Sequence, residues 1–395
     1  MTRLTRRAFH LTAAAFALTP RVACAGDWAA IEAQAKGQTV YFNAWAGSDT
    51  INAYIAWAGA ALAQRFGITL QHVKIADTAE VVRRVRDEVA AGQTAGSTDL
   101  IWINGENFRA MKQGNLLFGP FAEALPNFAL VDTGGKPTTL IDFAEPTGGY
   151  ESPWGMAQLT FFGDGAKIAA PPLSLPELIA FAKANPGRVT YPAPPDFHGT
   201  TFVKQVLAET VAAQLGQPVD AAGFAAVTAP LWQALDALHP HLWRQGKQFP
   251  PSQAAMKQML ADGELLIAFT FNPNEPANLV AAGELSVSTI AWQHRGGTIG
   301  NTHFLAIPIN ARAKPAAQVV ANFMLSAEAQ AHKADLKIWG DPTVLDLGRL
   351  TPEQAAAFAT TGVAGALRFP APAIPEPHGS WVPLIEAEWL KRYGV

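Results

Sequence analysis

Residues 38–103 alternate between apolar strand patterns and amphipathic helix patterns, and this alternation restricts the possible folds more than any other feature. Three strand patterns enclose two helix patterns, in the order 38–47, 48–67, 68–75, 77–92 and 99–103. The first helix pattern starts at Ser48 or Asp49 and ends at Gly67. The second starts at Asp77, another residue type that commonly caps helices. A β-α-β-α-β order predicts an α/β fold in which an open, mainly parallel sheet carries helices on both faces.

Polar residues follow two of these strands at the point where each strand ends. The two loops comprise residues 43–49 and 104–107, and both contain amide and carboxylate side chains that can bind a ligand. In open α/β sheets, ligands bind beyond the carboxyl ends of the strands. The sequence therefore predicts a binding site at this edge of the sheet.

The composition indicates a globular chain with room for two domains. The chain has 395 residues, of which 49% are hydrophobic and 15% charged, and its formal net charge is −3. These values exclude a disordered chain, and the lack of a basic block argues against a nucleic-acid partner. The sequence contains no G-x-S-x-G, H-E-x-x-H or G-x-x-x-x-G-K-[ST] motif. We therefore expect a binding protein without enzymatic activity, cofactor or metal.

Residues 1–25 have the pattern of an export signal. A basic start is followed by a short apolar stretch and an Ala-Cys-Ala sequence, which predicts cleavage after Ala25 and a periplasmic location. The sequence T-R-R-A-F around Arg6 and Arg7 resembles a twin-arginine signal; a general secretory signal is the alternative. Because Cys24 is the only cysteine, cleavage would leave a mature chain without thiol or disulfide chemistry, and lipidation of Cys24 is a further alternative.

The second half of the chain predicts another α/β lobe. A strand pattern at residues 264–271 is followed by Asn272, Asn274 and Glu275, which repeats the order of strand, polar loop and helix. Residues 187–210 predict a strand, a proline-rich loop and a helix, and the C-terminal segment predicts an amphipathic helix. Two α/β lobes joined by two crossings of the chain fit these patterns best.

Three segments resemble the extracellular solute-binding proteins of ABC importers, the group that contains maltose, polyamine, thiamine and ferric-ion binders. The segments are VYFNAWAGSDTINAYIAWAGAALAQRFG, STDLIWINGENFRAMKQGNLL and FLAIPINARAKPAAQVVANFMLSAEAQ. The third is the most specific, and the combination of DLIWINGENF with RVTYPAPPDFHGTTF is similar to the subgroup called YnjB-like. The resemblance implies a type II periplasmic binding fold, in which each lobe is an open, mainly parallel sheet flanked by helices and the ligand cleft lies between the two lobes. It also implies lobe boundaries at residues 26–152 with 300–395 for the first lobe and 153–299 for the second.

The candidate ligand-binding residues lie in loops that follow the predicted strands. From the first lobe they are Asn43, Trp45, Ser48, Asp49, Asn104, Glu106 and Asn107. From the second lobe they are Tyr191, Asp196, Phe197, Thr200, Asn272 and Asn274. The resemblance to the family adds Trp154, Asn301 and His303. Helix capping is the alternative role for the Ser, Asp and Thr residues of this set.

The acidic and aromatic residues of the set favour a small cationic or ring-bearing organic solute, because carboxylates and aromatic rings both attract cations. The helix after Asp196 would instead favour an oxyanion or a phosphate ester at its N-terminus. A secreted hydrolase using Glu106 and Asp196 is a third alternative. By the resemblance, Asn301 and His303 replace a tryptophan and an aspartate of the polyamine binders, which argues against a polyamine. The partners expected from the resemblance are the solute and a membrane permease, and we expect a monomer.

Overall fold

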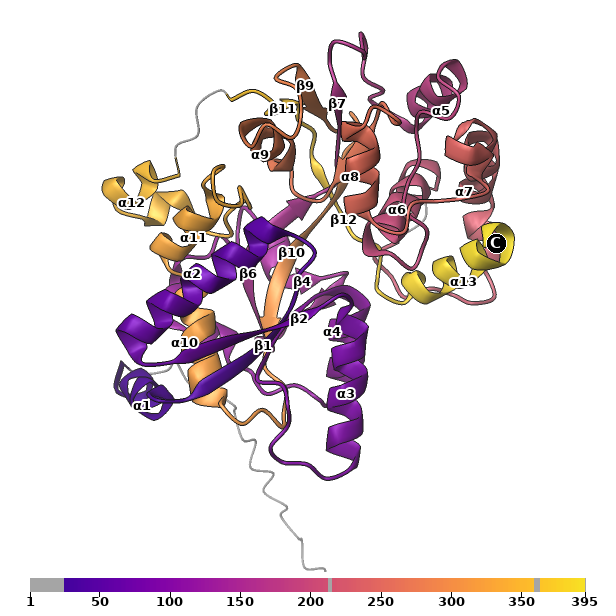
Figure 1. Cartoon of the computed structure of the whole chain (residues 1–395). Coiled ribbons are helices and arrows are strands. Elements are labelled where there is room, and N and C mark those ends of the chain that lie inside the picture. The colour runs from indigo at the N-terminus through magenta and orange to yellow at the C-terminus, as the bar shows by residue number, and fades with distance from the viewer. Residues whose placement is uncertain (1–24, 212–214, 359–362, 395) are drawn as a thin grey trace, which may run out of the picture.

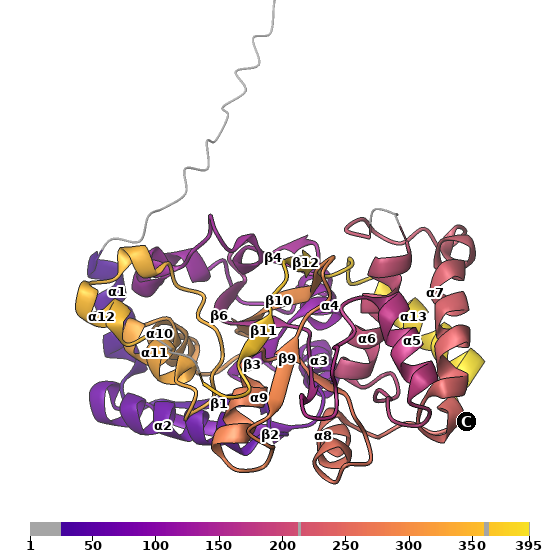
Figure 2. The ribbon, with the colours of Figure 1, turned by 90° about the horizontal axis from the view of Figure 1, so that it is seen from above.

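The computed structural model describes residues 25–211, 215–358 and 363–394 of the chain. They form two lobes, each built on its own β-sheet (Figures 1 and 2). Apart from Ala25, the predicted export signal lies outside the described residues. Within the described ranges, no helix combines the length and the apolar character that a bilayer-spanning segment needs.

The sheet of the first lobe has six strands in the order β12-β10-β3-β1-β2, with β6 also paired to β10. Its strands are β1 Thr39–Trp45, β2 Thr69–Ile75, β3 Leu100–Ile103, β6 Glu151–Gln158, β10 Thr298–Ala306 and β12 Ala373–Pro375. As predicted, β1 is parallel to both β2 and β3. β10 runs antiparallel to β3 and β6. The carboxyl ends of β1 and β3 therefore lie at the same edge of the sheet.

Helices cover both faces of this sheet. They are α1 Ala25–Ala35, α2 Asp49–Phe66, α3 Thr78–Ala90, α4 Gly105–Gln113, α10 Lys314–Met324, α11 Ala327–Ala334 and α12 Pro352–Ala356. Leu305 packs in one core with residues of α2 and α10, whereas Phe304 packs in another with residues of α3 and α4. Alternate residues of a strand point to opposite faces of the sheet, so these neighbours contribute to different cores.

The helix ends of the first lobe follow the predicted capping residues. Ser48 occupies the N-cap position of α2, and the helix ends at Gly67, whose φ of 65° is left-handed. The side chain of Asp77 caps α3 by accepting a hydrogen bond of 2.9 Å from the backbone N–H of Ala79. Local sequence signals thus suffice to place these two helices.

The sheet of the second lobe has four strands in the order β11-β9-β7-β8. They are β7 Thr160–Asp164, β8 Ala268–Thr270, β9 Thr289–Trp292 and β11 Leu367–Phe369. The helices of this lobe are α5 Leu175–Ala184, α6 Phe197–Thr210, α7 Phe224–Leu238, α8 Gln253–Ala261, α9 Glu275–Ala281 and α13 Trp381–Tyr393. β7 runs antiparallel to both β8 and β9, so the prediction of a mainly parallel second sheet is wrong.

Short elements complete the described structure. They are the ribbon of β4 Ile141–Asp142 with β5 Glu145–Pro146, and the 3₁₀ turns Ala122–Ala124, Pro126–Leu130, Pro137–Thr139, His239–His241, Trp243–Gly246 and Leu347–Arg349. The ribbon belongs to the loop that connects α4 to β6. Its first strand carries Asp142 into the region between the lobes.

The C-terminal segment does not stay with the first lobe. β12 joins the first sheet, but α13 places Trp381, Ile385 and Trp389 in the core of the second lobe. Figure 1 shows α13 beside α6 and α7. The assignment of all of residues 300–395 to the first lobe is therefore wrong for β11 and for the last helix. The boundary at residue 153 is also wrong, because β6 keeps residues 153–158 in the first sheet. The apolar face of α13 is buried against the second sheet's helices, and this contact is not visible in the sequence.

Candidate functional site

Carboxyl groups from distant parts of the chain converge where the two lobes meet. Glu106 lies in the first turn of α4 and Asp142 lies in β4, both in the first lobe. Glu376 follows β12, and Glu386 lies on α13 of the second lobe. Lys204, on α6, acts electrostatically on Glu106, Asp142 and Glu386. We call these four acids and Lys204 the carboxylate cluster.

Lys204 is held between the lobes by an ion pair and two aromatic rings. The residue is 1% exposed, and Nζ donates a hydrogen bond of 2.7 Å to Oε2 of Glu376. Nζ also lies 4.4 Å from the centre of the Phe143 ring and 5.7 Å from that of Phe197. The other oxygen of Glu376, Oε1, accepts a hydrogen bond of 2.9 Å from Nδ2 of Asn301 on β10. Glu376 therefore connects a strand of the first sheet to a helix of the second lobe.

The N-terminus of α4 is packed closely enough to require glycine. The N–H of Gly105 donates a 2.6 Å hydrogen bond to Oδ2 of Asp142, and its φ of 62° is left-handed. A Cβ on Gly105 would lie 3.0 Å from the ring of Phe143. A Cβ on Gly379, in the segment before α13, would lie 3.3 Å from the backbone nitrogen of Glu106. Small residues at both positions let these segments hold Glu106 between the lobes.

Burial changes the acidity of three groups in the cluster. It raises the pKa of Glu106 to about 7; the charges of Glu386 and Glu376 add to this effect, and Lys204 opposes it. Burial also raises the pKa of Asp142 well above its usual range, against the hydrogen bond from Gly105. The pKa of Glu386 is raised by burial as well. The cluster thus contains more carboxyl groups than one lysine can neutralise, and burial favours the protonated form of these three acids.

Other predicted site residues contact the cluster directly. Thr200 donates a 2.7 Å hydrogen bond from its hydroxyl to Oε1 of Glu386, and Nδ2 of Asn107 donates one of 3.2 Å to Oε1 of Glu106. Phe197 is 38% exposed and contributes one of the rings beside Lys204. Asn104 occupies the N-cap position of α4, but its side chain makes no capping hydrogen bond. The structure therefore brings these predicted residues together at one end of α4.

Asp196 has the capping role that the sequence left open. Its Oδ1 accepts hydrogen bonds from the backbone N–H groups of His198 at 2.9 Å and Gly199 at 3.1 Å. The side chain of Thr200 is directed instead to Glu386. The first free N–H groups of α6 are therefore already occupied by a carboxylate of the same chain.

Two predicted site residues are structural residues inside single lobes. Asn43 is fully buried, and its Oδ1 accepts a 2.5 Å hydrogen bond from Arg84, which joins β1 to α3. Tyr191 is fully buried in the second core, where its hydroxyl accepts a 2.8 Å hydrogen bond from Trp389 and contacts His239 at 2.7 Å. Their polar groups are satisfied within the lobe that contains them, so their contact with a ligand stays a prediction.

The rest of the first predicted loop lies apart from the cluster. Trp45 packs against the larger core of the first lobe. The hydroxyl of Ser48 hydrogen bonds that of Thr50 at 2.8 Å, and Asp49 is exposed at the start of α2. A ligand contact by these residues stays a prediction.

A second contact between the lobes uses amide side chains. Nδ2 of Asn272 donates to the carbonyl of Trp339 at 3.0 Å, and Nδ2 of Asn274 donates to that of Gly340 at 2.7 Å. Asn278 on α9 donates a further hydrogen bond to the carbonyl of Trp339. The residues after β8 thus bind the loop that follows α11 of the first lobe. The predicted asparagines therefore hold the lobes together in this structure.

Trp154 and His303 lie beside that loop, inside the first lobe. Trp154 is fully buried, with its ring centre 5.0 Å from that of Trp102. His303 contacts Oδ1 of Asp341 at 2.9 Å, and Lys333 pairs with the other oxygen of the same carboxylate. Both predicted residues are part of this packed arrangement, so their contact with a ligand stays a prediction.

Sequence reasoning missed Asp142, Lys204, Glu376 and Glu386. Lys204 carried a usable signal, because it stands within the apolar helix pattern F-V-K-Q-V-L of α6, where a lysine is unusual unless it is paired. Asp142, Glu376 and Glu386 do not directly follow a strand of the predicted parallel sheet, so the rule that selected the binding loops does not select them. Only the folded chain brings them to Glu106.

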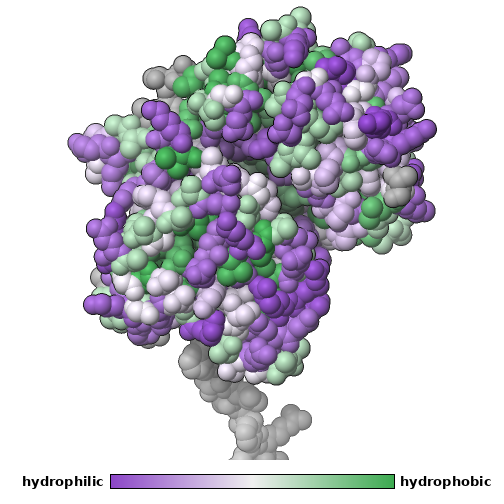
Figure 3. Space-filling view, in the orientation of Figure 1, coloured by the Kyte–Doolittle hydropathy of each residue, from purple (hydrophilic) through white to green (hydrophobic). Residues whose placement is uncertain are grey.

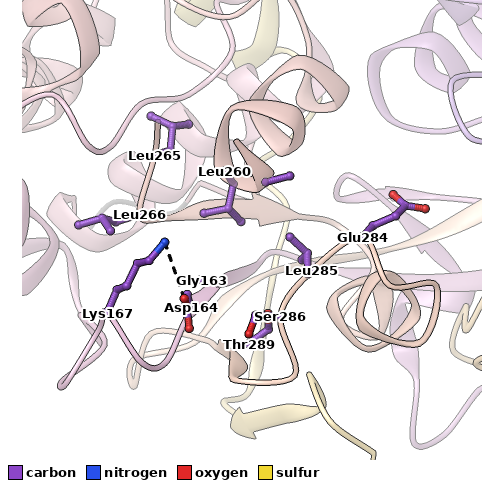
Figure 4. A pocket seen from close by; sticks show the side chains of 11 residues that line it. Gly163, Asp164, Lys167, Leu260, Leu265, Leu266, Glu284, Leu285, Ser286 and Thr289 are labelled. Carbon is purple, nitrogen blue, oxygen red and sulfur yellow. Dashed lines mark ion pairs between the residues drawn. The ribbon is translucent and has the colours of Figure 1, made fainter. Parts of the chain in front are cut away.

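A small cavity of about 110 Å³ lies elsewhere, within the second lobe (Figure 4). Its walls include Leu260, Leu265 and Leu285, and Lys167 pairs with Asp164 at 3.8 Å beside it. The residues that line it come from this lobe alone and include no member of the carboxylate cluster. The junction between the lobes, where the surface in Figure 3 is indented, remains the better candidate for the ligand site.

Comparison with known proteins identifies the family. Residues 57–357 match the family described as bacterial extracellular solute-binding protein. The chain is also 49% identical over 377 residues to protein YnjB of Escherichia coli strain K12, covering 94% of this chain and 95% of that protein. This chain belongs to the bacterial extracellular solute-binding proteins. The resemblance predicted from the sequence is thereby confirmed.

Solved structures of solute-binding proteins share the fold. The protein AfuA of Actinobacillus pleuropneumoniae, with fructose-6-phosphate bound, has a TM-score of 0.60 at 14% identity, covering 90% of this chain and 99% of that one. The spermidine/putrescine substrate-binding protein PotD of Streptococcus pneumoniae has a TM-score of 0.54 at 15% identity, covering 81% and 88%. The predicted two-lobed type II fold is confirmed. The family is one of solute-binding proteins, so family membership supports the predicted binding role over the hydrolase alternative.

Proposed function

We propose that this solute-binding protein captures a small organic cation in the periplasm and delivers it to an ABC permease. The carboxylate cluster would bind the positive group of the solute. The observation that supports this proposal is the convergence of Glu106, Asp142, Glu376 and Glu386 around Lys204 where the lobes meet.

The excess of acids over cations favours a positively charged ligand. A carboxylate taken out of water is costly unless an opposite charge lies close to it. In this structure Lys204 pairs with Glu376, and burial raises the pKa values of Glu106, Asp142 and Glu386 although the charge of Lys204 opposes the shift. A cationic solute would supply the missing charge and replace protons on these acids.

An oxyanion or a phosphate ester has weaker support. The N-terminus of α6 was the sequence feature that favoured an anion, but Asp196 accepts the hydrogen bonds of its N–H groups. An anion would also have to approach several carboxyl groups, and like charges repel strongly in a poorly hydrated site. For an anion to bind here, both the Asp196 cap of α6 and the carboxylate cluster would have to rearrange.

The same proposal covers export and partners. Residues 1–25 would direct export through the twin-arginine route, with cleavage after Ala25, and the mature protein would act as a monomer. The lobes would close on the solute and present the closed form to the permease. The family supports the permease as partner. The export route and the monomeric state rest on the sequence alone.

Mass spectrometry of solute released from natively purified protein tests the proposal. We expect a compound that carries a positive charge at neutral pH and that raises the unfolding temperature of the stripped protein when it is added back. Recovery of an anionic or phosphorylated compound with the same stabilising effect would overturn the cationic assignment. The family membership would be unaffected by that outcome.

A further inference from the structure

A cavity of about 270 Å³ lies between the lobes, next to the carboxylate cluster. Its walls are mostly apolar and include Ile141, Phe143, Ala144 and Pro375, and Gly216 closes it from the second lobe. Ile141 is 45% exposed, so the cavity has an open side. An engineered cavity of about 150 Å³ is large enough for benzene, so this space can hold one ring with a short substituent.

Two residues, Phe143 and Glu376, connect the cavity to the carboxylate cluster. Phe143 lines the cavity and presents its ring face to Lys204 Nζ at 4.4 Å. Glu376 also lines it, and Oε2 of this carboxylate accepts the 2.7 Å hydrogen bond of Lys204. A positive group bound beside Glu376 would therefore have the apolar cavity as its immediate neighbour.

Asn301 holds Glu376 in the wall of the cavity. The residue is only 4% exposed, and Nδ2 donates to Glu376 at 2.9 Å. Its Oδ1 is buried and has no hydrogen-bond partner among the residues that the structure describes. Because Oδ1 has almost no accessible surface, a solute in the cavity would not contact it.

We infer that this cavity binds the apolar part of the solute, and that the solute is an amphipathic organic cation. Its positive group would lie at the carboxylate cluster, and its ring or compact apolar body would lie in the cavity. This inference rests on the proposed function and narrows its substrate class. A linear polyamine would leave the apolar walls uncovered, whereas an aromatic or alicyclic amine would cover them.

Calorimetry on the full mature protein with three probes tests the inference. The probes are phenethylamine, ethylamine and phenylacetate, which separate the contributions of ring and charge. Burying the ring should make phenethylamine bind at least about tenfold more tightly than ethylamine, and phenylacetate should not bind. Equal affinities of the two amines would overturn the cavity assignment and leave the cationic site in place. Binding of phenylacetate without either amine would overturn the proposed function itself.

A substitution in the cavity gives an independent readout. A Cβ on Gly216 would point toward Ala144 at 4.0 Å, so Gly216→Leu would fill the space, and we expect it to weaken phenethylamine about tenfold. Gly296→Leu is the matched control, because a Cβ there meets no atom within 4 Å and the residue does not line the cavity. Thermal unfolding of both variants checks their folding. Unchanged phenethylamine affinity in a folded Gly216→Leu protein, or no binding of phenethylamine at millimolar concentration to the unsubstituted protein, would overturn the inference.

Discussion

Replacing Glu106 by glutamine removes a carboxyl group whose pKa is raised to about 7 and leaves a neutral side chain of nearly the same shape. If the solute is cationic, the substitution removes a charge-assisted interaction in a site that the closed lobes shield from water. Such an interaction is worth about 1.5–3 kcal/mol, which corresponds to roughly one to two decades in affinity. We expect Glu106→Gln to weaken binding by this amount at a pH where the carboxylate is ionised.

The pH dependence of binding follows from the same pKa. A cation that requires ionised Glu106 loses affinity in proportion to the protonated fraction, so lowering the pH from about 8 to about 5.5 should weaken binding roughly thirtyfold. Glu106→Gln should bind with much less dependence on pH. Any pH dependence of binding that remains in this variant would reflect the ionisation of Glu386 and Asp142, whose pKa values are also raised by burial.

The ligand-free protein provides a second measurement with a definite sign. The pKa of Glu106 is raised from 4.5 to about 7 in the folded protein, so the folded form binds its proton more tightly than the unfolded form. The resulting contribution to stability is fully present below about pH 4.5 and is lost as the pH rises to about 7. Because Glu106 keeps some solvent exposure, we expect Glu106→Gln to raise the free energy of unfolding near pH 8 by about 1–3 kcal/mol.

Calorimetry measures the affinity of each protein for the solute that mass spectrometry identifies, at several values between about pH 5.5 and about pH 8. Chemical denaturation of the ligand-free proteins gives the stabilities. Glu284→Gln is the control, since this glutamate is exposed on the second lobe and belongs to no part of the cluster. A profile that is flat for the unsubstituted protein, or identical in Glu106→Gln, would refute the role of Glu106. Tighter binding by the variant would indicate an anionic solute.

Three further predictions concern other parts of the chain. Lys204→Met leaves Glu376 buried without its ion-pair partner, so chemical denaturation should show a loss of about 3 kcal/mol in the free energy of unfolding. A loss smaller than the experimental error would contradict the stabilising role of this ion pair. The double substitution Asn272→Ala and Asn274→Ala removes hydrogen bonds between the lobes, and small-angle scattering should show a more open ligand-free protein, whereas an unchanged profile would argue against that role. Changing Arg6 and Arg7 together to lysine should retain the precursor in the cytoplasm, and normal export would indicate the general secretory route.

Part of the site was predictable because some of its residues follow strands. Glu106 and Asn107 stand directly after β3, and the rule that ligands bind beyond the carboxyl ends of strands selects them without a structure. Asn43 obeys the same rule in sequence but is buried and bonded to Arg84. Whether a polar side chain faces a ligand or a neighbouring helix depends on packing partners that lie elsewhere in the chain.

The partners of Glu106 could not be predicted from local patterns. Glu376 and Glu386 come from the C-terminal segment, which looks from its sequence like an amphipathic helix able to pack on either lobe. Placing Trp389 in the second core brings Glu386 to the junction between the lobes. The raised pKa of Glu106 likewise depends on burial by both lobes, so it is a property of the assembled fold.

The sequence by itself determined the helices and strands, the α/β class and the family of this protein, because apolar periodicity, capping residues and characteristic segments act over short distances along the chain. Tertiary structure alone decided which lobe received α13, that the second sheet has an antiparallel central strand, and that four acids meet Lys204 beside an apolar cavity. These outcomes depend on the burial of apolar surface and on electrostatic interactions between residues far apart in sequence. Such interactions exist only once the chain has folded.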